Sequence, residues 1–538
     1  MGNRSSKNSK KIKDLKDPKD SKSTVLINKL LRTIRDEGIA LFHDQFNEPH
    51  ALLSNAQVVR MRSRAFSRWL ADFVFQRLHW APTVTMFQTI LQLLEGQAQC
   101  RGERIELQVR VAEGRNCLYY DLGDGKAVLI TPKEWRIVGL GPKISDEKHE
   151  TVEQSSPILF RRFAHQKPQV KPKPKGDLRS FLELVNLPQE GENREKGLLL
   201  LVWLVTAFIP GFPHPILALY GPQGSAKSTL FKLLKELIDP CAVQSLAPSY
   251  NPSDFALQAS HHWFLPLDNL SEMPMWLSNA LCRTCTGEAF SRRQLFEDVE
   301  ETIFSFQRVI GLGGINLVAY RPDLLDRCLL LGLEQISDSS RRLENEMWER
   351  FVKVKPLLLG AIFDAVVGAL QYYPDVKLTE LPRMADFARW GVAVALALGY
   401  KAEEFLSAYK ASISRQHREA INANLVAQAI VEMMKTKAKW EGTPSQLLGV
   451  LFDAAIELNI DTRIPSWPKE PNWVWRRLNE ARTNLEAVGI KVEKGEDEER
   501  YIKIWKTGVG AEGVADKDGN PAASQRPQPT PDEEGDKS

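Results

Sequence analysis

Cysteine, net charge and long apolar runs are all scarce in this chain of 538 residues. Its six cysteines are too thinly scattered for a disulfide framework, so we expect a reducing compartment, the cytoplasm. No apolar run reaches the roughly 18 residues of a membrane-spanning helix. The longest, residues 197–210, is expected to be a buried helix, and neither a membrane contact nor a signal peptide is expected. A net charge of +3 excludes a uniformly basic protein, so any DNA-binding surface must come from local clusters of Lys and Arg.

Two patterns could indicate a metal site, and each has a simpler interpretation. Cys282 and Cys285 form the only CxxC and lack further ligands at zinc spacing, so two core residues one helical turn apart explain them. Asp121 and Asp124 could form the acid pair of a primase. However, Asp124-Gly125 is typical of a type I′ hairpin turn between two strands. Because the acid cluster of a primase is missing, primer synthesis is not expected.

Changes in composition and periodicity predict an α/β protein made of several parts. The expected parts are a disordered basic tail (1–23), an α+β accessory module (24–165), a Pro- and Lys-rich linker (166–177), an α/β core (178–335), a helical lid region (336–440), a compact C-terminal domain (441–507) and a disordered tail (508–538). Within the accessory module, residues 23–97 have helical spacing, whereas residues 103–138 alternate as strands do. The expected core positions of the helical part are Phe42, Phe66, Trp69, Leu70 and Phe73.

A glycine-rich run, GPQGSAKST at residues 221–229, follows a short apolar strand at 216–220 and precedes a helical pattern. Backbone N–H groups in such a turn and at the start of the helix bind phosphates. Lys227 is expected to lie between the β- and γ-phosphates, and Ser228 to ligate magnesium. The last glycine of the usual pattern is replaced by Ala226, a change of one methyl group. The sequence therefore predicts that ATP and Mg²⁺ bind to Gly221, Pro222, Gln223, Gly224, Ser225, Ala226, Lys227, Ser228 and Thr229.

A second apolar strand, residues 263–267, ends in Asp268. An acid in this place holds magnesium in P-loop enzymes, and this is the role expected of Asp268. The alternative is an aspartate that caps a helix beginning near Ser271. Asn269 follows, where many related enzymes have the Glu that activates water. Another acid, for which Glu272 is the candidate, must then serve as the base, or hydrolysis is slow.

A third strand, residues 308–316, ends in Asn316, a polar residue suited to sensing the γ-phosphate or the attacking water. Arg321 and Arg327 follow it. Ring ATPases place an arginine beyond the sensor, where it completes the site of the neighbouring subunit. The alternative for Arg327 is a surface salt bridge with Asp326, which would contribute little. The expected catalytic residues are Lys227, Asp268, Asn316 and Arg327.

Together these blocks resemble the superfamily 3 helicases of the AAA+ class. They are most similar to the primase–helicases of phages, plasmids and integrated elements that are related to the poxvirus type. The resemblance is carried by residues 221–229, 264–271, 286–298 and 310–327, and more loosely by residues 119–138. It implies an AAA+ P-loop core with a helix-rich lid, assembled as a ring that is expected to be a hexamer. It also implies that Arg292 and Arg293 contact DNA on a hairpin in the central channel, although without the family a solvated surface pair is equally plausible.

The C-terminal segment, residues 441–507, is predicted to form helices followed by two alternating strands, a pattern typical of a winged helix-turn-helix. Its helix from Pro471 onward would be the recognition helix. The DNA contacts expected on that helix are Arg476, Arg477 and Arg482. Because several glutamates dilute the positive charge, a protein-binding winged helix is the alternative.

The main hypothesis is an ATP-dependent DNA helicase or translocase of a phage, plasmid or integrated element, acting as a ring during replication. Its expected partners are DNA, copies of itself and replication proteins. The alternative is a nucleotide-dependent DNA-binding switch, such as an initiator or loader, in which slow hydrolysis controls assembly. A defence or scaffold ATPase without a DNA role is a third class, which salt-dependent DNA binding would exclude.

Overall fold

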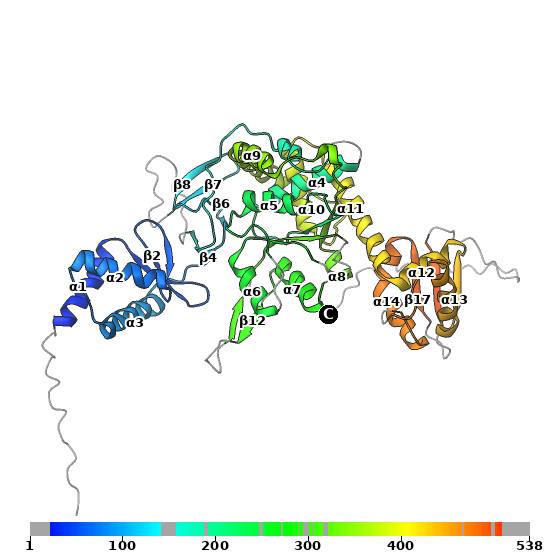
Figure 1. The fold of residues 1–538 in the computed structure, drawn as a ribbon, viewed down its shortest axis with the longest axis horizontal. Coiled ribbons are helices and arrows are strands. Elements are labelled where there is room, and N and C mark those ends of the chain that lie inside the picture. Colours follow the sequence, from blue (N-terminus) through cyan, green and yellow to red (C-terminus); the bar gives the residue numbers. More distant parts are fainter. Residues whose placement is uncertain are drawn as a thin grey trace, which may run out of the picture. The chain divides into compact units, whose positions relative to one another are not determined.

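The computed structural model shows a mixed α/β protein with several sheets and many helices (Figure 1). It describes residues 22–140, 158–187, 192–246, 251–270, 273–288, 290–293, 301–304, 306–315, 321–464, 467–495 and 501–507. The chain divides into two compact units, Met1–Ala423 and Asn424–Ser538. Among the described residues, no helix combines the length and the apolarity that a bilayer crossing requires.

The first unit contains a four-stranded parallel sheet. Its strands, in spatial order, are β11 (Phe264–Leu267), β14 (Val309–Gly314), β10 (Ile216–Tyr220) and β15 (Cys328–Gly332). Nearly every strand residue is buried, because a parallel sheet is covered on both faces. This explains why the strands are continuous apolar runs rather than alternating ones. The strands predicted near 216–220, 263–267 and 308–316 are confirmed.

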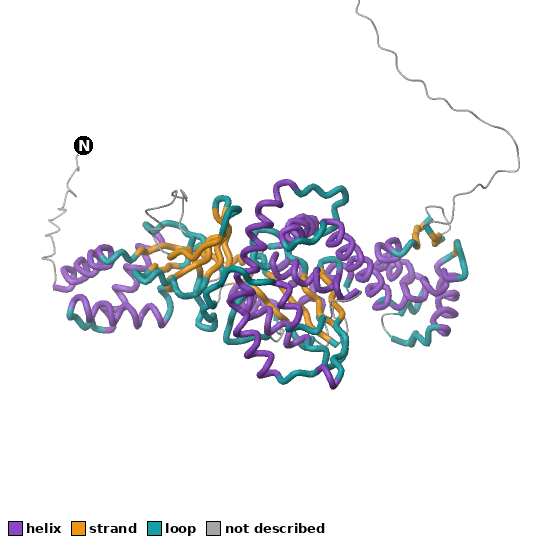
Figure 2. The backbone as a smooth tube through the Cα atoms, turned by 90° about the horizontal axis from the view of Figure 1, so that it is seen from above, coloured by secondary structure: helices purple, strands orange, loops and turns teal. Residues whose placement is uncertain are grey.

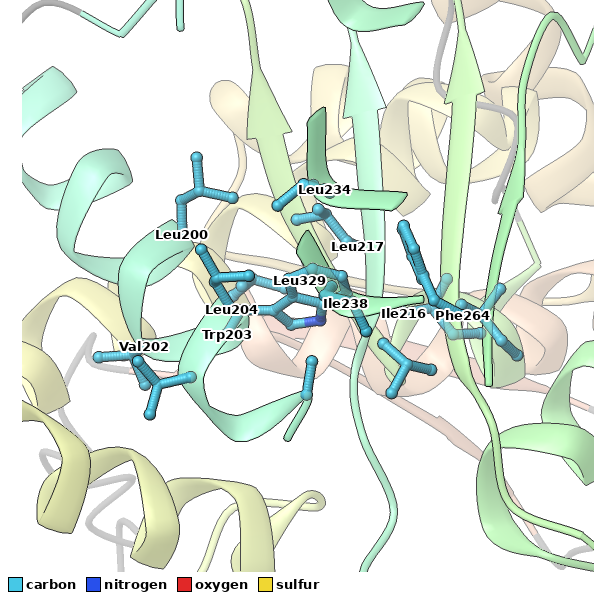
Figure 3. Packing of buried hydrophobic residues seen from close by; sticks show 14 of the residues in the cluster. Leu200, Val202, Trp203, Leu204, Ile216, Leu217, Leu234, Ile238, Phe264 and Leu329 are labelled. Carbon is cyan, nitrogen blue, oxygen red and sulfur yellow. The ribbon is translucent and has the colours of Figure 1, made fainter. Parts of the chain in front are cut away.

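A buried helix packs against this sheet. It is α4 (Glu192–Thr206), and its residues 198–205 are all buried, which confirms the helix predicted from the longest apolar run. The indole of Trp203 donates a hydrogen bond to the carbonyl oxygen of Pro215 at 2.8 Å, just before β10 begins. Figure 3 shows Trp203 and Leu204 beside Ile216 of β10 and Ile238 of α5 (Lys227–Ile238), so helix and strand share one apolar core.

Further helices complete this part of the first unit. They are α6 (Pro252–His261), α7 (Met275–Thr286), α8 (Pro322–Leu325), α9 (Glu344–Tyr372), α10 (Ala385–Ala397) and α11 (Ala402–Ala423), with short 3-10 helices η1 (Leu178–Glu183), η2 (Asp338–Ser340) and η3 (Tyr373–Asp375). A two-stranded antiparallel ribbon, β12 (Phe290–Arg293) with β13 (Glu301–Phe304), lies in the chain between α7 and β14. The region that follows β15 is therefore mainly helical.

The N-terminal part differs from the helical prediction for residues 23–97. Between α1 (Lys22–Asp36) and the pair α2 (Arg64–Leu78) and α3 (Val84–Cys100), it has three antiparallel strands: β1 (Ala40–His43), β2 (Pro49–Leu52) and β3 (Val58–Arg60). Asn47 and Ala56 adopt left-handed φ values of 60° and 61° in the two turns that reverse the chain. Short apolar runs do not distinguish helix from strand by spacing alone, and the turns decide here. Of the expected core positions, Phe42, Phe66, Leu70 and Phe73 are buried and Trp69 is half-buried.

The second part of the accessory module is a sheet of order β5-β6-β7-β8. The strands are β5 (Val111–Gly114), β6 (Cys117–Asp121), β7 (Lys126–Ile130) and β8 (Trp135–Gly139). A small parallel pair is formed by β4 (Leu107–Gln108), which precedes these strands in the chain, and β9 (Leu159–Phe160), which follows them. We call β5 to β8 the accessory sheet. The strand–turn–strand prediction at 119–130 is confirmed.

The turn type predicted for this hairpin is wrong. Positive φ values occur at Gly123 (91°) and Gly125 (79°) but not at Asp124, so the turn is not type I′. Leu122 N–H donates to the carbonyl of Lys126 at 2.9 Å, which closes a wider loop. Asp121 at its start is buried and accepts hydrogen bonds from the Arg162 guanidinium, with Nη2 2.6 Å from Oδ1. That ion pair accounts for the buried carboxylate.

The Pro- and Lys-rich segment 166–177, expected to be a stiff linker, is fastened along the first unit. We call it the strap. Its Gln169 is only 7% exposed, and the side-chain amide donates to the carbonyl of Leu237 at 3.0 Å. The backbone N–H of Lys173 donates to the carbonyl of Pro356 in α9 at 2.8 Å. Its proline content suits an extended backbone, but these contacts make it a packed element rather than a free spacer.

The second unit is a small helical body with one three-stranded antiparallel sheet. Its elements are α12 (Leu425–Lys435), β16 (Lys439–Gly442), α13 (Pro444–Glu457), α14 (Pro471–Ala487), β17 (Ile490–Lys494) and β18 (Ile502–Lys506). The sheet order is β16-β18-β17, and in Figure 2 its short strands lie beside the helices of this unit. The two predicted strands after α14 are confirmed. The unit also includes α12, before the boundary expected at 441.

Candidate functional site

The loop between β10 and α5 has an unusual backbone. Gly221, Gly224 and Ala226 have positive φ values of 143°, 78° and 63°. A Cβ atom added at Gly221 would lie 2.1 Å from the carbonyl oxygen of Leu333, so no other residue fits there. Ala226 carries its methyl group in a left-handed conformation, which costs roughly 1–2 kcal/mol for an L-residue. The alanine that departs from the usual glycine therefore keeps the backbone that the glycine would favour.

This loop leads into the uncapped start of a helix. Lys227 is the first residue of α5, and Ala226 at the N-cap provides no side-chain hydrogen bond to the first turn. The first N–H groups of a helix have no partners within it and carry the positive end of the helix dipole. Together with the loop N–H groups, they form a site suited to an anion such as phosphate.

The ammonium group of Lys227 lies over the same loop. Its Nζ donates to the carbonyls of Gly221 (2.7 Å) and Pro222 (2.8 Å) and to Oγ of Ser225 (3.0 Å). Burial lowers the pKa of Lys227 below its ordinary value, and the charge of Asp268 partly offsets this effect. Nζ of Lys227 therefore lies where phosphate oxygens would replace its carbonyl acceptors.

Asp268 follows β11 and is only 7% exposed. Its Oδ1 accepts a hydrogen bond from the N–H of Asn269 at 2.9 Å, and within the described part of the chain it forms no salt bridge. Buried carboxylates are normally paired with a cation or coordinate a metal. Asp268 and Ser228, the half-buried second residue of α5, therefore offer the kind of oxygen ligands that a magnesium ion prefers.

Gly313 is a residue of this site that sequence reasoning missed. A Cβ atom at this position would lie 2.4 Å from Oδ1 of Asp268 and 2.8 Å from the Phe231 ring. The available signal was a glycine inside an apolar strand, which often marks the close approach of another group. Gly313 therefore makes room for the carboxylate on the neighbouring strand.

Gly313→Ala is expected to displace the Asp268 carboxylate. Under the predicted role of this site, the variant also loses the magnesium dependence of nucleotide binding. Overpacking is expected to lower its stability by about 1–3 kcal/mol. Titrating ATP with and without Mg²⁺, alongside thermal unfolding, measures both effects. Gly139→Ala in β8 is the control, because an added Cβ there meets nothing within 4 Å. Unchanged magnesium dependence in Gly313→Ala would contradict this account of the site.

The backbone conformation at position 269 favours asparagine over glutamate. Its φ is 57°, in the left-handed region that asparagine tolerates better than glutamate does. The next N–H, of Leu270, donates to the carbonyl of Gly313 at 2.9 Å. The amide side chain cannot act as a general base. The other candidate base, Glu272, lies outside the described residues, as does Ser271 of the helix-capping alternative.

Arg327 lies at the opposite end of β10 from the loop. The N–H of Ile216 donates to its carbonyl at 2.8 Å, and Nη1 donates to the carbonyl of Asp323 at 2.6 Å. At about 3.3 Å per residue, the five residues of β10 separate Arg327 from Gly221 by roughly 16 Å. Its side chain cannot reach the loop of its own chain.

The salt bridge considered as the alternative role of Arg327 is not present in the described structure. Asp326 pairs instead with Arg383, whose Nη1 lies 2.8 Å from Oδ2. Arg321 pairs weakly with Asp323 at 3.8 Å. Asn316, the expected sensor, lies outside the described residues, because the described segment that contains β14 stops at residue 315 and the next begins at 321.

The expected DNA-contacting arginines fall in two places. Arg292 and Arg293 lie on β12, paired with Thr302 and Glu301 of β13, and the structure describes only their backbone. The other three lie on α14, and each forms an ion pair on its own helix: Arg476–Glu480 at 3.8 Å, Arg477–Glu480 at 3.1 Å and Arg482–Glu486 at 3.8 Å. Those pairs are solvent-exposed, so phosphates can compete for them.

A cavity of about 440 Å³ opens beside the loop. Its walls come from residues 183–186, from the loop and the first turn of α5, and from residues 336–347. Leu184, Val185, Ile336 and Met347 are apolar, whereas Glu183, Arg341, Arg342 and Glu344 are charged. Apolar walls combined with polar groups are typical of a small-molecule site. No single stretch of sequence could reveal it, because its walls come from three separate segments.

A group of possible metal ligands lies away from the loop. Within the described residues, His165, Cys241 and His262 are the only such group, with ligand atoms within 4.8 Å of one another. The ammonium Nζ of Lys235 is 3.2 Å from Nδ1 of His262. A positive charge at that distance opposes a further cation, and we assign no metal there. Of the CxxC pair, Cys285 donates its thiol to the carbonyl of His214 at 2.9 Å.

Two family models match the chain. The model of the actinomycete integrative conjugative element replication protein matches residues 179–418, and that of the RepA C-terminal domain of these elements matches residues 426–518. The chain is thus similar to these proteins over the parallel sheet, its surrounding helices and the second unit, which indicates a role in replication. No curated protein matches the chain.

Solved structures give a weaker likeness. Two A-form apo structures of the NrS-1 C-terminal region are 12% identical and cover 90% of this chain and 98% of theirs, with TM-scores of 0.40 and 0.37. A further apo structure of this region is 12% identical, covers 91% of this chain and 100% of that one, and has a TM-score of 0.40.

Proposed function

We propose that this chain is an ATP-dependent replication motor that acts on DNA. The observation that carries the proposal is the placement of Lys227, Ser228 and Asp268 after the carboxyl ends of two strands of one parallel sheet, with an uncapped helix N-terminus at Lys227. The similarity to replication proteins of integrative elements supports DNA as the partner. In this proposal the parallel sheet is an AAA+ P-loop core, α9 to α11 are its lid and the second unit is a winged helix-turn-helix.

Within the proposed site each residue has a distinct role. The loop N–H groups and the start of α5 bind the phosphates, and Lys227 exchanges its carbonyl contacts for oxygens of the β- and γ-phosphates. Ser228 and Asp268 hold Mg²⁺, which neutralises charge that develops on the phosphates. The cavity beside Ala226 accepts the base and sugar. Asn316 is proposed to sense the γ-phosphate.

Arg327 is proposed to act on the site of a neighbouring subunit. Arg327 is too far from the loop of its own chain to act there. An arginine finger supplied in trans is consistent with its place beside the first residue of β10, at the end of the strands opposite to the loop. Hydrolysis then occurs only between subunits. The assembly is proposed to be a ring, most simply a hexamer.

The second candidate is a nucleotide-dependent DNA-binding switch. It is favoured by Asn269, which replaces the usual base and sits in a backbone conformation that disfavours glutamate. Steady-state ATPase assays with and without single-stranded DNA, together with unwinding of a forked duplex, separate the two. A motor is expected to be accelerated by DNA and to unwind the fork. If DNA has no effect on turnover and the fork stays intact, the switch replaces the motor.

The basic residues of α14 are proposed to contact DNA phosphates. In a triple variant, Arg476→Ala, Arg477→Ala and Arg482→Ala, we expect a plot of log affinity for duplex DNA against log salt to become shallower by about two to three units, because each lost phosphate contact contributes about 0.9. Fluorescence anisotropy at several salt concentrations measures this slope. Arg463→Ala is the control, because Arg463 is exposed, pairs with Asp461 and lies outside α14. An unchanged slope in the triple variant would favour a protein-binding role.

A further inference from the structure

The last turn of α5 is held by residues of the accessory sheet and the strap. The final carbonyl groups of a helix have no partner within it. In α5, the Leu237 carbonyl accepts from the Tyr120 hydroxyl at 3.3 Å and from the Gln169 amide at 3.0 Å. The Ile238 carbonyl accepts from Tyr120 at 3.2 Å. The end of this helix is thus capped by side chains 68 and 117 residues away in the sequence.

Arg110 adds a buried ion pair to the same helix end. Its Nε lies 3.0 Å from Oδ1 of Asp239, and its Nη2 donates to the carbonyl of Pro240 at 3.1 Å. Lys235 donates to the other oxygen of Asp239 at 2.7 Å. Burial alone would raise the pKa of Asp239, but the charges of Lys235 and Arg110 hold that pKa well below its ordinary value. The carboxylate is therefore ionised, and both cations lie where the helix dipole favours them.

The same contacts reach the strand that precedes Asp268. Nζ of Lys235 also donates to the carbonyl of Phe264, the first residue of β11, at 2.7 Å. Lys227 begins α5, and Lys235 and Asp239 lie at its end. One buried junction thus fixes the end of α5 against the start of β11. At their opposite ends, these two elements carry Lys227 and Asp268.

The backbone at Arg110 is itself unusual. Its φ is 63°, in the left-handed region that arginine rarely adopts. Val111 N–H donates to the Val109 carbonyl at 2.8 Å, so a γ-turn is centred on Arg110. Asp121 N–H donates to the Arg110 carbonyl at 2.8 Å. This turn accompanies a guanidinium that is fully buried against the end of α5.

We infer that Arg110 is a positioning residue of the nucleotide site: with Tyr120 and Gln169 it clamps the C-terminal end of the phosphate-binding helix. The inference rests on the proposed ATPase function. It gives the accessory module a role in that function, because the module holds the helix that carries Lys227. A partner that displaces the module is expected to change nucleotide affinity, and nucleotide binding is expected to stabilise the clamp in return.

The test compares two arginines of the accessory module in the full-length protein. Arg110 and Arg161 both pair with buried carboxylates, Asp239 and Asp44, and of these two acids only Asp239 is the C-cap residue of α5. Amide hydrogen exchange without nucleotide is measured at a temperature where both Ala variants are folded. In Arg110→Ala, exchange in residues 230–238 is expected to rise at least tenfold, whereas Arg161→Ala leaves it as in the wild type. Equal protection in Arg110→Ala and the wild type, or equal loss in both variants, would overturn the clamp.

A second arm measures ATP affinity at the same temperature. Arg110→Ala is expected to weaken ATP binding at least tenfold, Arg110→Lys to recover part of the loss, and Arg161→Ala to change it less than twofold. Tyr120→Phe retains the ring and removes only the hydroxyl, so this variant replaces Arg110→Ala in the test if Arg110→Ala does not fold. It is expected to weaken ATP binding by a smaller factor than Arg110→Ala. If the wild type binds no ATP, the proposed function fails, while the exchange arm still decides the clamp.

Discussion

Lys227→Ala is expected to abolish ATP hydrolysis, lowering kcat by at least about 100-fold, the scale of losing one preorganised charge contact to a reacting group. The reason is the position of Nζ over the loop, where it would pair with the β- and γ-phosphates. Alanine leaves the loop backbone in place, so the protein is expected to stay folded. A coupled ATPase assay with matched circular dichroism spectra measures the effect.

Lys410→Ala is the matched control for this variant. Lys410 lies on α11, is exposed and pairs with Glu380 at 2.6 Å. Removing a solvent-exposed pair of this kind changes stability by about 1 kcal/mol or less, and it should leave turnover unaltered. Full ATPase activity in Lys227→Ala would show that the loop is not the nucleotide site.

Arg327→Ala is expected to retain ATP binding but to lose turnover by about 10³-fold or more, as arginine fingers do when removed. The physical reason is its place at the start of β15, too far from its own loop to contribute to binding there. Comparing the Kd for ATP with kcat in the same preparation separates binding from turnover. Arg383→Ala is the control, because it removes the partner of Asp326 and leaves Arg327 in place.

Mixing the two inactive variants tests the action in trans directly. A subunit with Lys227→Ala still supplies Arg327, and one with Arg327→Ala still supplies an intact loop. Mixed assemblies are therefore expected to regain part of the wild-type rate, while each variant alone stays inactive. If mixing restores nothing although the subunits exchange, hydrolysis does not occur between subunits.

The elements nearest the candidate site could be predicted because their signals are local. The apolar run that ends at Tyr220, the glycines after it and the helical spacing from Leu230 all lie within a few residues. Each signal depends on residue type alone: burial selects the strand, and a left-handed backbone selects Gly221 and Gly224. The start of α5 at Lys227 follows from the same run.

Other features depend on pairs that the sequence does not bring together. Gly313 is explained only by the Asp268 carboxylate on the adjacent strand, and Arg110 only by Asp239, 129 residues further along the chain. The strands at 40–60 were predicted as helix because the left-handed turn at Asn47 is not visible in apolar spacing. Whether a short apolar segment becomes helix or strand depends on tertiary contacts, which override local periodicity.

The most direct test of the central claim is a calorimetric titration of the wild-type protein and Lys227→Ala with ATP, each with and without Mg²⁺. We predict one ATP site per chain in the wild type, with affinity that increases with Mg²⁺, and at least tenfold weaker binding in Lys227→Ala. Equal affinity in the two proteins, or no binding by the wild type, would contradict the assignment of this loop as an ATP site.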